Sequence, residues 1–367
     1  MKVEVITLHR VTNFGSLLQT YATQTILEQL GHQVEVIDFV PEGLSFLRSV
    51  WPKGQSTVKR LLKLVPLAFC NVVQFAMTDS FLCKYIHLSA ERYTSYFRLA
   101  MAHPKADVYL SGSDQVWNTQ NNNPPEDLGA YYLAFAKDAK RIAYAGSFGK
   151  DAFLDEERAQ ITAWLKQYRA ISVREDTAVG MLKNLGLSAT HVVDPTLLLT
   201  ANQWRSFCTR RPPTLGYVFV YNLNRNKVLE KAALEIAKTK NLRVVNFADT
   251  FEWIESAENR FGNDPLDFLN YISHADYVVT DSFHGTAFSL NFARQFLSIP
   301  APKYNCRLES ILRMCGCEDR MFTTLEEALH LVQNNIDYTV VSKRLEANRE
   351  RSMQFLRHAL EGIYDEH

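Results

Sequence analysis

The 367-residue sequence lacks an excess of charge of either sign, because its 40 basic residues balance 40 acidic ones. A surface that tracks nucleic-acid phosphates needs many more Lys and Arg, so the balance argues against a dedicated nucleic-acid binder. Cysteine is also sparse: six residues occur without a CxxC pair, which favours free thiols in a reducing compartment over a disulfide scaffold or a zinc site. An anionic ligand must therefore be met by a local group of basic side chains.

Long apolar runs are missing too. The longest, residues 64–77, is interrupted by Pro66, Asn71 and Gln74, and it is too short and too polar to span a bilayer. Residues 1–5 enter a strand pattern without a basic leader, so no signal peptide is expected and the location is expected to be cytoplasmic.

Short apolar runs alternate with segments of helical periodicity, which predicts an α/β protein with parallel sheets. The expected architecture is two doubly wound Rossmann-like domains facing a cleft, over residues 1–205 and 214–340, followed by a C-terminal helix over 341–367. The strands are predicted at 2–8, 33–38, 107–110, 141–145, 170–173 and 191–193 in the first half, and at 216–221, 242–247, 276–280 and 295–299 in the second.

Residues 45–100 interrupt this alternation with a pattern typical of helices, so the sequence predicts a helical insertion in the first domain. Its basic residues Lys53, Lys59, Arg60 and Lys63 precede the apolar stretch. One interpretation is a helical hairpin packed on its own sheet. The other is a lid or a patch that lies on an anionic membrane surface.

Polar turns follow nearly every predicted strand, at the sheet edge where open α/β folds bind ligands. No turn has the GxGxxG spacing of a dinucleotide site or the GxxxxGK[ST] spacing of a P-loop. The turn at 280–285, Thr-Asp-Ser-Phe-His-Gly, places a histidine at a helix N-terminus, where backbone N–H groups and the helix dipole attract anions. Read alone, it could equally be a capped turn with a histidine of no function.

Six of these segments together resemble the polysaccharide pyruvyl transferase family. They are residues 13–16, the GSDQVWN run at 112–118, 147–150, 172–175, 194–198 and the DSFHG run at 281–285. The resemblance extends over roughly residues 3–320 and implies a fold like that of GT-B glycosyltransferases. It also implies transfer of a pyruvyl group from phosphoenolpyruvate to two hydroxyls of a sugar, giving a pyruvate ketal. Phosphoenolpyruvate is then a donor substrate, and neither a cofactor nor a metal is expected.

The resemblance implies a role for each site residue. His284 is the expected general acid/base, because histidine suits proton transfer near neutral pH, and Arg174 and Asp281 are expected to act with it. The expected donor-binding residues are Ser282, Gly285, Lys150 and Arg307. The residues expected to contact the acceptor or line the cleft are Asn13, Ser113, Asp114, Gln115, Trp117, Asn118, Glu175 and Asn222.

Two points stay open in this assignment. Many members carry an arginine two residues before the histidine, where this sequence has Ser282, so Arg174, Lys150 or Arg307 must supply the charge that meets the donor. Trp117 is either a stacking face for a sugar ring or a plug in the protein core.

The acceptor is expected to be a glycan, in a polysaccharide or in a lipid-linked precursor, with peripheral contact at the inner face of the membrane. Two alternatives remain: a GT-B glycosyltransferase that uses a nucleotide sugar, and a non-catalytic carbohydrate- or anion-binding protein of the same fold.

Overall fold

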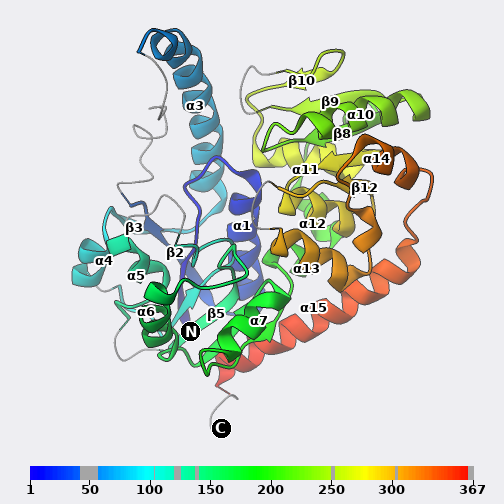
Figure 1. The fold of residues 1–367 in the computed structure, drawn as a ribbon. Coiled ribbons are helices and arrows are strands. Elements are labelled where there is room, and N and C mark those ends of the chain that lie inside the picture. Colours follow the sequence, from blue (N-terminus) through cyan, green and yellow to red (C-terminus); the bar gives the residue numbers. More distant parts are fainter. Residues whose placement is uncertain are drawn as a thin grey trace. The chain divides into compact units, whose positions relative to one another are not determined.

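A computed structural model describes residues 1–41, 57–102, 104–119, 125–136, 140–248, 253–301 and 305–362, without the side chains of residues 57–67. The chain divides into two compact units. Unit 1 comprises Met1–Trp51, Asp79–Leu198 and Asn348–His367, and unit 2 comprises Pro52–Thr78 and Leu199–Ala347. Each unit is built on its own parallel sheet (Figure 1).

The sheet of unit 1 has seven strands in the order β3-β2-β1-β4-β5-β6-β7, and every pairing is parallel. The order reverses between β1 and β4, which makes that pair the topological switch point. The strands are β1 (Lys2–Ile6), β2 (Gln33–Phe39), β3 (Leu88–Tyr93), β4 (Val108–Ser111), β5 (Lys140–Gly146), β6 (Ala170–Val173) and β7 (Thr190–His191). The helices are α1 (Phe14–Gln29), α4 (Tyr96–Ala102), η2 (Pro125–Asp127), α5 (Leu128–Tyr131), α6 (Asp155–Leu165), α7 (Asp176–Lys183) and α8 (Pro195–Leu198).

The sheet of unit 2 has five parallel strands in the order β10-β9-β8-β11-β12, with its switch point between β8 and β11. The strands are β8 (Tyr217–Tyr221), β9 (Arg243–Phe247), β10 (Glu258–Arg260), β11 (Tyr277–Thr280) and β12 (Gln295–Ser298). The helices are α9 (Ala201–Phe207), α10 (Lys227–Lys240), α11 (Pro265–His274), α12 (Phe283–Asn291), α13 (Cys306–Cys315), η3 (Glu318–Arg320) and α14 (Leu325–Leu331).

The central strands form because they are short, apolar and buried on both faces, as a parallel sheet covered by helices requires. All residues of β4, β6, β8 and β11 are buried. The predicted α/β class with two doubly wound, Rossmann-like sheets is confirmed.

Several boundaries differ from the sequence-based ones. The segment predicted as a helical insertion contains helix α3 (Thr57–Tyr85) but also strand β3, which joins the sheet edge, and α3 is divided between the two units at Thr78. The segment of unit 1 that precedes α9 ends at Leu198 rather than near 205, since α9 belongs to unit 2. The C-terminal helix is α15 (Tyr338–Glu361), and its residues from Asn348 onward belong to unit 1.

Helix α3 includes the apolar stretch at residues 64–77, and Phe69 and Val72 in it are more than half exposed. Lys53 lies outside the described residues, as do the side chains of Lys59, Arg60 and Lys63. In the part of the chain that the structure describes, no helix combines the length and apolarity needed to cross a membrane.

Candidate functional site

The switch point of unit 1 brings together the turns that follow β1 and β4. The Thr7 hydroxyl donates to the carbonyl of Ser113 at 2.8 Å, and the Ser16 hydroxyl donates to the carboxylate of Asp114. Asn13 caps helix α1, since its side-chain oxygen accepts from the N–H groups of Gly15 and Ser16. These contacts fix the predicted polar turns at the edge where a doubly wound sheet binds ligands.

A buried ionic cluster lies at the same edge, and we call it the Arg174 cluster. It consists of Arg174 and the carboxylates of Asp114, Glu175 and Asp194, all less than a tenth exposed. The guanidinium is 3.0 Å from Asp194, 3.1 Å from Glu175 and 3.8 Å from Asp114. Burial lowers the pKa of Arg174, but the three carboxylates outweigh it and hold the pKa above its usual value. With three carboxylates for one cation, the cluster is formally negative.

Asp114 has a strained backbone, with a φ of 72° in the left-handed region that few residues other than glycine adopt. Its carboxylate accepts from its neighbour's backbone, the N–H of Gln115, at 2.9 Å. Strain of this kind persists only where the surroundings enforce it, and it collects at functional sites. Asp114 is also the most exposed carboxylate of the Arg174 cluster, with 9% of its side chain accessible against 2% or less for the other two.

Lys150 is held by neighbours in its own unit. Its ammonium group pairs with the carboxylate of Glu157 and donates to the Thr119 hydroxyl at 2.9 Å. Beside it, Gln115 accepts from the side-chain amide of Asn118 at 2.7 Å. Lys150 and Arg174, two of the three cations expected to meet the donor, therefore already have carboxylate partners.

Trp117 is a core residue, which decides between the two roles that the sequence left open. It is fully buried and stacks on Tyr132 at 5.5 Å between ring centroids. Its indole N–H donates to the carbonyl of Tyr131 at 3.3 Å. A Cβ at Gly146 would lie 2.7 Å from the indole, so the glycine is needed for this packing. The expectation that Trp117 offers a face to a sugar ring is therefore wrong.

A second buried polar group in unit 1 was not assigned a role from the sequence. His9, directly after β1, lies with Nδ1 3.0 Å from the carbonyl of Thr7 and Nε2 3.1 Å from the carboxylate of Asp38. Burial raises the pKa of Asp38, but hydrogen bonds from His9, Arg10 and Arg92 outweigh it and lower the pKa below its usual value. Both ring nitrogens face an oxygen that can accept a hydrogen bond. In the sequence, this pair could have been recognised from a histidine and an aspartate that lie near the ends of two neighbouring strands.

The switch point of unit 2 joins the turns after β8 and β11. Both carboxylate oxygens of Asp281 accept from the preceding turn, from the N–H of Leu223 at 2.7 Å and from that of Asn224 at 2.8 Å. Burial raises the pKa of Asp281 despite these hydrogen bonds. Asn222 accepts from the N–H of Asn226 at 2.9 Å, so it shapes the same turn. Both residues lie at the predicted edge, and the hydrogen bonds of Asp281 hold the two turns together.

Helix α12 begins at this switch point and carries the DSFHG motif in its first turn. Ser282 is the N-cap, and its side chain accepts from the N–H of Gly285 at 3.3 Å. A Cβ at position 285 would lie 2.5 Å from the hydroxyl oxygen of Thr280, so only glycine fits there. His284 is 4% exposed and sits in the first turn, edge-on to the ring of Phe283. Helix α12 begins at Phe283, directly after its N-cap Ser282.

Arg307 belongs to the same unit as His284. It is half-buried in the first turn of α13, and α13 packs against α12. The predicted site residues therefore fall into two sets. Unit 1 holds Asn13, Ser113, Asp114, Gln115, Asn118, Lys150, Arg174 and Glu175, and unit 2 holds Asn222, Asp281, Ser282, His284, Gly285 and Arg307.

The order of these motifs along the chain fits one known family model. The model of polysaccharide pyruvyl transferases matches residues 13–301, which include every turn described above from Asn13 to Gly285. The chain belongs to this family. No curated protein matches the sequence at a significant level.

Two solved structures illustrate the similarity in fold. A Listeria monocytogenes protein described as a UDP-N-acetylglucosamine 2-epimerase has a TM-score of 0.55 and 12% identity, covering 100% of this chain and 97% of its own. Staphylococcus aureus MnaA in complex with UDP has a TM-score of 0.53 and 12% identity, with 98% and 97% covered. At such low identity these structures show the GT-B-like, two-Rossmann-domain fold alone.

Proposed function

We propose that the chain transfers the pyruvyl group of phosphoenolpyruvate to two hydroxyls of a sugar in a polysaccharide or its lipid-linked precursor. The methylene carbon of the donor gains a proton, and a first hydroxyl loses its proton as its oxygen bonds to the adjacent carbon. Phosphate then leaves with the electrons of its C–O bond, and the second hydroxyl attacks the same carbon and loses its proton. The products are a cyclic pyruvate ketal and inorganic phosphate.

In this proposal phosphoenolpyruvate binds to unit 2, and the main observation behind it is the first turn of α12. Phosphoenolpyruvate has a phosphate and a carboxylate, which need backbone donors and cations. The N-terminus of α12 offers N–H groups and His284, and Arg307 lies on the adjacent helix α13. Arg174 and Lys150 suit the donor less well, because both are already paired with carboxylates. Ser282 then acts as the N-cap of α12, and Arg307 supplies the positive charge that binds phosphoenolpyruvate.

The acceptor is assigned to the Arg174 cluster. A sugar hydroxyl donates readily to a carboxylate, and a surplus of carboxylates repels a trianionic donor. Asp114 is the most exposed of them and is held in a strained conformation. It is the best placed of the three to accept the proton of an attacking hydroxyl. Arg174 then holds the other two carboxylates in position.

Peripheral contact with a membrane surface is part of the proposal for a lipid-linked acceptor. Helix α3 exposes Phe69, Val72 and Met77, at 55%, 51% and 37%, on a segment that follows a run of basic residues. An amphipathic basic helix of this kind binds anionic lipid surfaces.

The test measures donor binding and phosphate release separately. Calorimetry with phosphoenolpyruvate tests the donor without any acceptor, and phosphate release with acceptor glycans tests turnover. His284→Gln is expected to abolish release while retaining most donor binding. His274→Gln is the matched control, because His274 lies at the end of α11, before β11, and contacts the carbonyl of Asn270.

Each outcome bears on the proposal. Binding of phosphoenolpyruvate that weakens in Arg307→Ala supports the donor assignment. Nucleotide release from a UDP-sugar, with no response to phosphoenolpyruvate, contradicts the proposal and favours a glycosyltransferase. Carbohydrate binding without release from either donor favours a binding protein of the same fold.

A further inference from the structure

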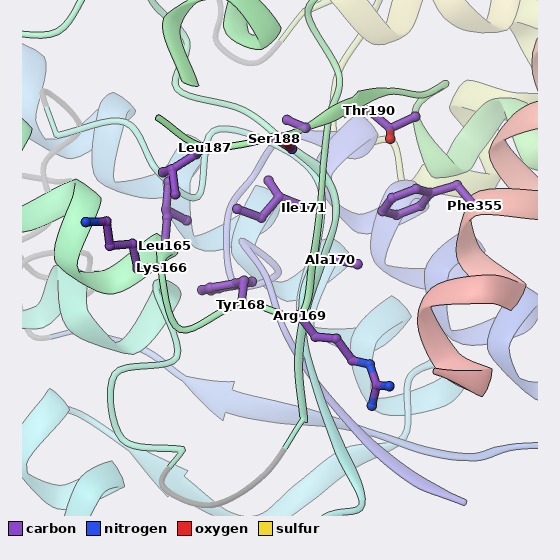
Figure 2. Close-up of a pocket in the computed structure, with 11 residues that line it drawn as sticks. Leu165, Lys166, Tyr168, Arg169, Ala170, Ile171, Leu187, Ser188, Thr190 and Phe355 are labelled. Atoms are coloured by element: carbon purple, nitrogen blue, oxygen red, sulfur yellow. The ribbon is translucent and has the colours of Figure 1, made fainter. Parts of the chain in front are cut away.

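A cavity of about 310 Å³ lies in unit 1 at the amino ends of β6 and β7 (Figure 2). This is the sheet edge opposite the Arg174 cluster, since Arg174 and Glu175 follow the carboxyl end of β6. The cavity reaches the lower end of the size range of small-molecule sites. None of the residues assigned to donor or acceptor lines it.

The walls of the cavity are apolar and come from separate elements. Leu165 ends α6, Ile171 lies in β6, Leu187 precedes β7 and Phe355 lies in α15. Figure 2 shows the Phe355 ring on one side, directed toward Ile171, with Leu165 and Leu187 on the other side. Leu165, Ile171 and Phe355 are buried, so these walls belong to the packed core and the space between them is preformed.

The charged groups at the cavity are all positive. Lys166 is exposed and Arg169 is half-buried, and no acidic side chain occurs among the described residues that line the cavity. The guanidinium of Arg169 is held in place, because it donates to the carbonyl of Gly362 at 2.8 Å. A Cβ at Gly362 would lie 2.6 Å from that nitrogen, so the glycine makes room for it. The charges lie at the margin, and the apolar side chains form the interior.

We propose that this cavity binds an organic anion with an apolar body and a single carboxylate. An apolar body of aromatic or aliphatic carbon fills the space beside Phe355 and Ile171, where a sugar would leave its hydroxyls unsatisfied. The carboxylate remains at the margin near Lys166, which lies beside Leu165 (Figure 2). Inorganic phosphate is also an anion, but it has no apolar group to fill the cavity.

This site is separate from the transfer reaction. Strand β6 has four residues, so the cavity and the Arg174 cluster lie roughly 13 Å apart along it. Binding at the cavity can therefore be measured without phosphoenolpyruvate or acceptor, and its failure would leave the proposed function untouched.

The experiment uses 2-naphthoate as the probe, followed by calorimetry and by saturation-transfer NMR on the full chain. Lys166→Ala is expected to weaken binding by about two- to fivefold, the usual range for an exposed ion pair. Ala189→Phe places a ring in the cavity from a half-exposed position and is expected to weaken binding by at least about tenfold. The matched controls are Lys183→Ala and Ala159→Phe, at exposed positions that do not line the cavity.

Two further probes separate charge from apolar body. The neutral 2-naphthamide and inorganic phosphate should each bind much more weakly than 2-naphthoate. Equal binding of the amide overturns the requirement for an anion, and displacement of 2-naphthoate by phosphate overturns the requirement for an apolar body. Unchanged binding in Ala189→Phe, or no binding to the wild type, overturns the site itself.

Discussion

Replacing Arg174 with Met removes the only cation of the Arg174 cluster and keeps a side chain of similar length. Three carboxylates would remain in a site where Asp194, Glu175 and Asp114 are each less than a tenth exposed. The wild-type guanidinium donates to Asp194 at 3.0 Å and to Glu175 at 3.1 Å. Breaking a buried ion pair by removing one partner costs about 3–5 kcal/mol, because a charge stays buried without compensation. We expect a loss of free energy of unfolding in that range near neutral pH.

The loss should depend on pH, and its sign follows from the carboxylates. Without Arg174, repulsion and burial raise their pKa values in the folded state above those in the unfolded chain. A folded variant then binds protons that the unfolded chain does not, so its stability rises as the pH falls. The difference between wild type and Arg174→Met should therefore be largest near about pH 8 and shrink toward about pH 5.

The assay is urea unfolding at several pH values, combined with hydrogen exchange of peptides from β6 and from the turn after β4. Hydrogen exchange is needed because a chain of two units need not unfold in one step. Arg158→Met is the control, since Arg158 is half-exposed and pairs with Asp155 on the surface, where a pair contributes at most about 1 kcal/mol. An equal loss at every pH, or a loss as small as in the control, would refute the reasoning. A double variant that also carries Asp194→Asn should recover part of the loss.

Three further predictions concern other parts of the two units. Gly285→Ala forces a Cβ to 2.5 Å from the Thr280 hydroxyl, so thermal unfolding should show a loss of about 1–3 kcal/mol, together with weaker binding of phosphoenolpyruvate. Trp117→Ala should cost about 3–5 kcal/mol in urea unfolding, as expected for a core residue; a stable variant with only a raised KM for the acceptor would contradict that role. Because the pKa of Asp38 is lowered, the stability that its ionised form adds is complete above about pH 4 and is lost on acidification. Asp38→Asn should therefore be less stable than the wild type at neutral pH. In acid titrations it should lose less further stability below about pH 4 than the wild type does.

The central strands were predictable because burial on both faces leaves a continuous apolar run, as in β6 and β11. Two edge strands, β3 and β10, were not. Strand β3 has three exposed residues, including Glu91, and a single buried one, and β10 has three polar residues, so neither has an apolar pattern. An edge strand is defined by its backbone pairing with a neighbour, which a sequence pattern does not show.

The location of the site was more predictable than its chemistry. Turns at strand ends and the sheet order of a doubly wound fold place Asp114 and Asp281 at switch points, and the structure has them there. Two partners of Arg174, Asp194 and Asp114, come from 20 and 60 residues away and could not be inferred from spacing. Trp117 shows the same limit, since the glycine that admits its ring lies 29 positions further along the chain.

The ion pairs of the described site residues indicate a different set of donor-binding cations from the one that the motifs alone suggest. The motifs alone suggest that Arg174 and Lys150 supply the positive charge that binds phosphoenolpyruvate. In the structure, both side chains are buried and paired with carboxylates. A trianionic substrate would have to compete with Asp194 and Glu157 for these cations, and that competition is costly because each carboxylate is in direct contact with its cation. The serine at position 282 is compatible with donor binding only if another cation in unit 2 takes the place of the missing arginine. Arg307 is half-buried on a helix packed against α12, so Arg307→Ala should weaken phosphoenolpyruvate binding more than Lys150→Ala does, and the opposite order would return the donor to unit 1.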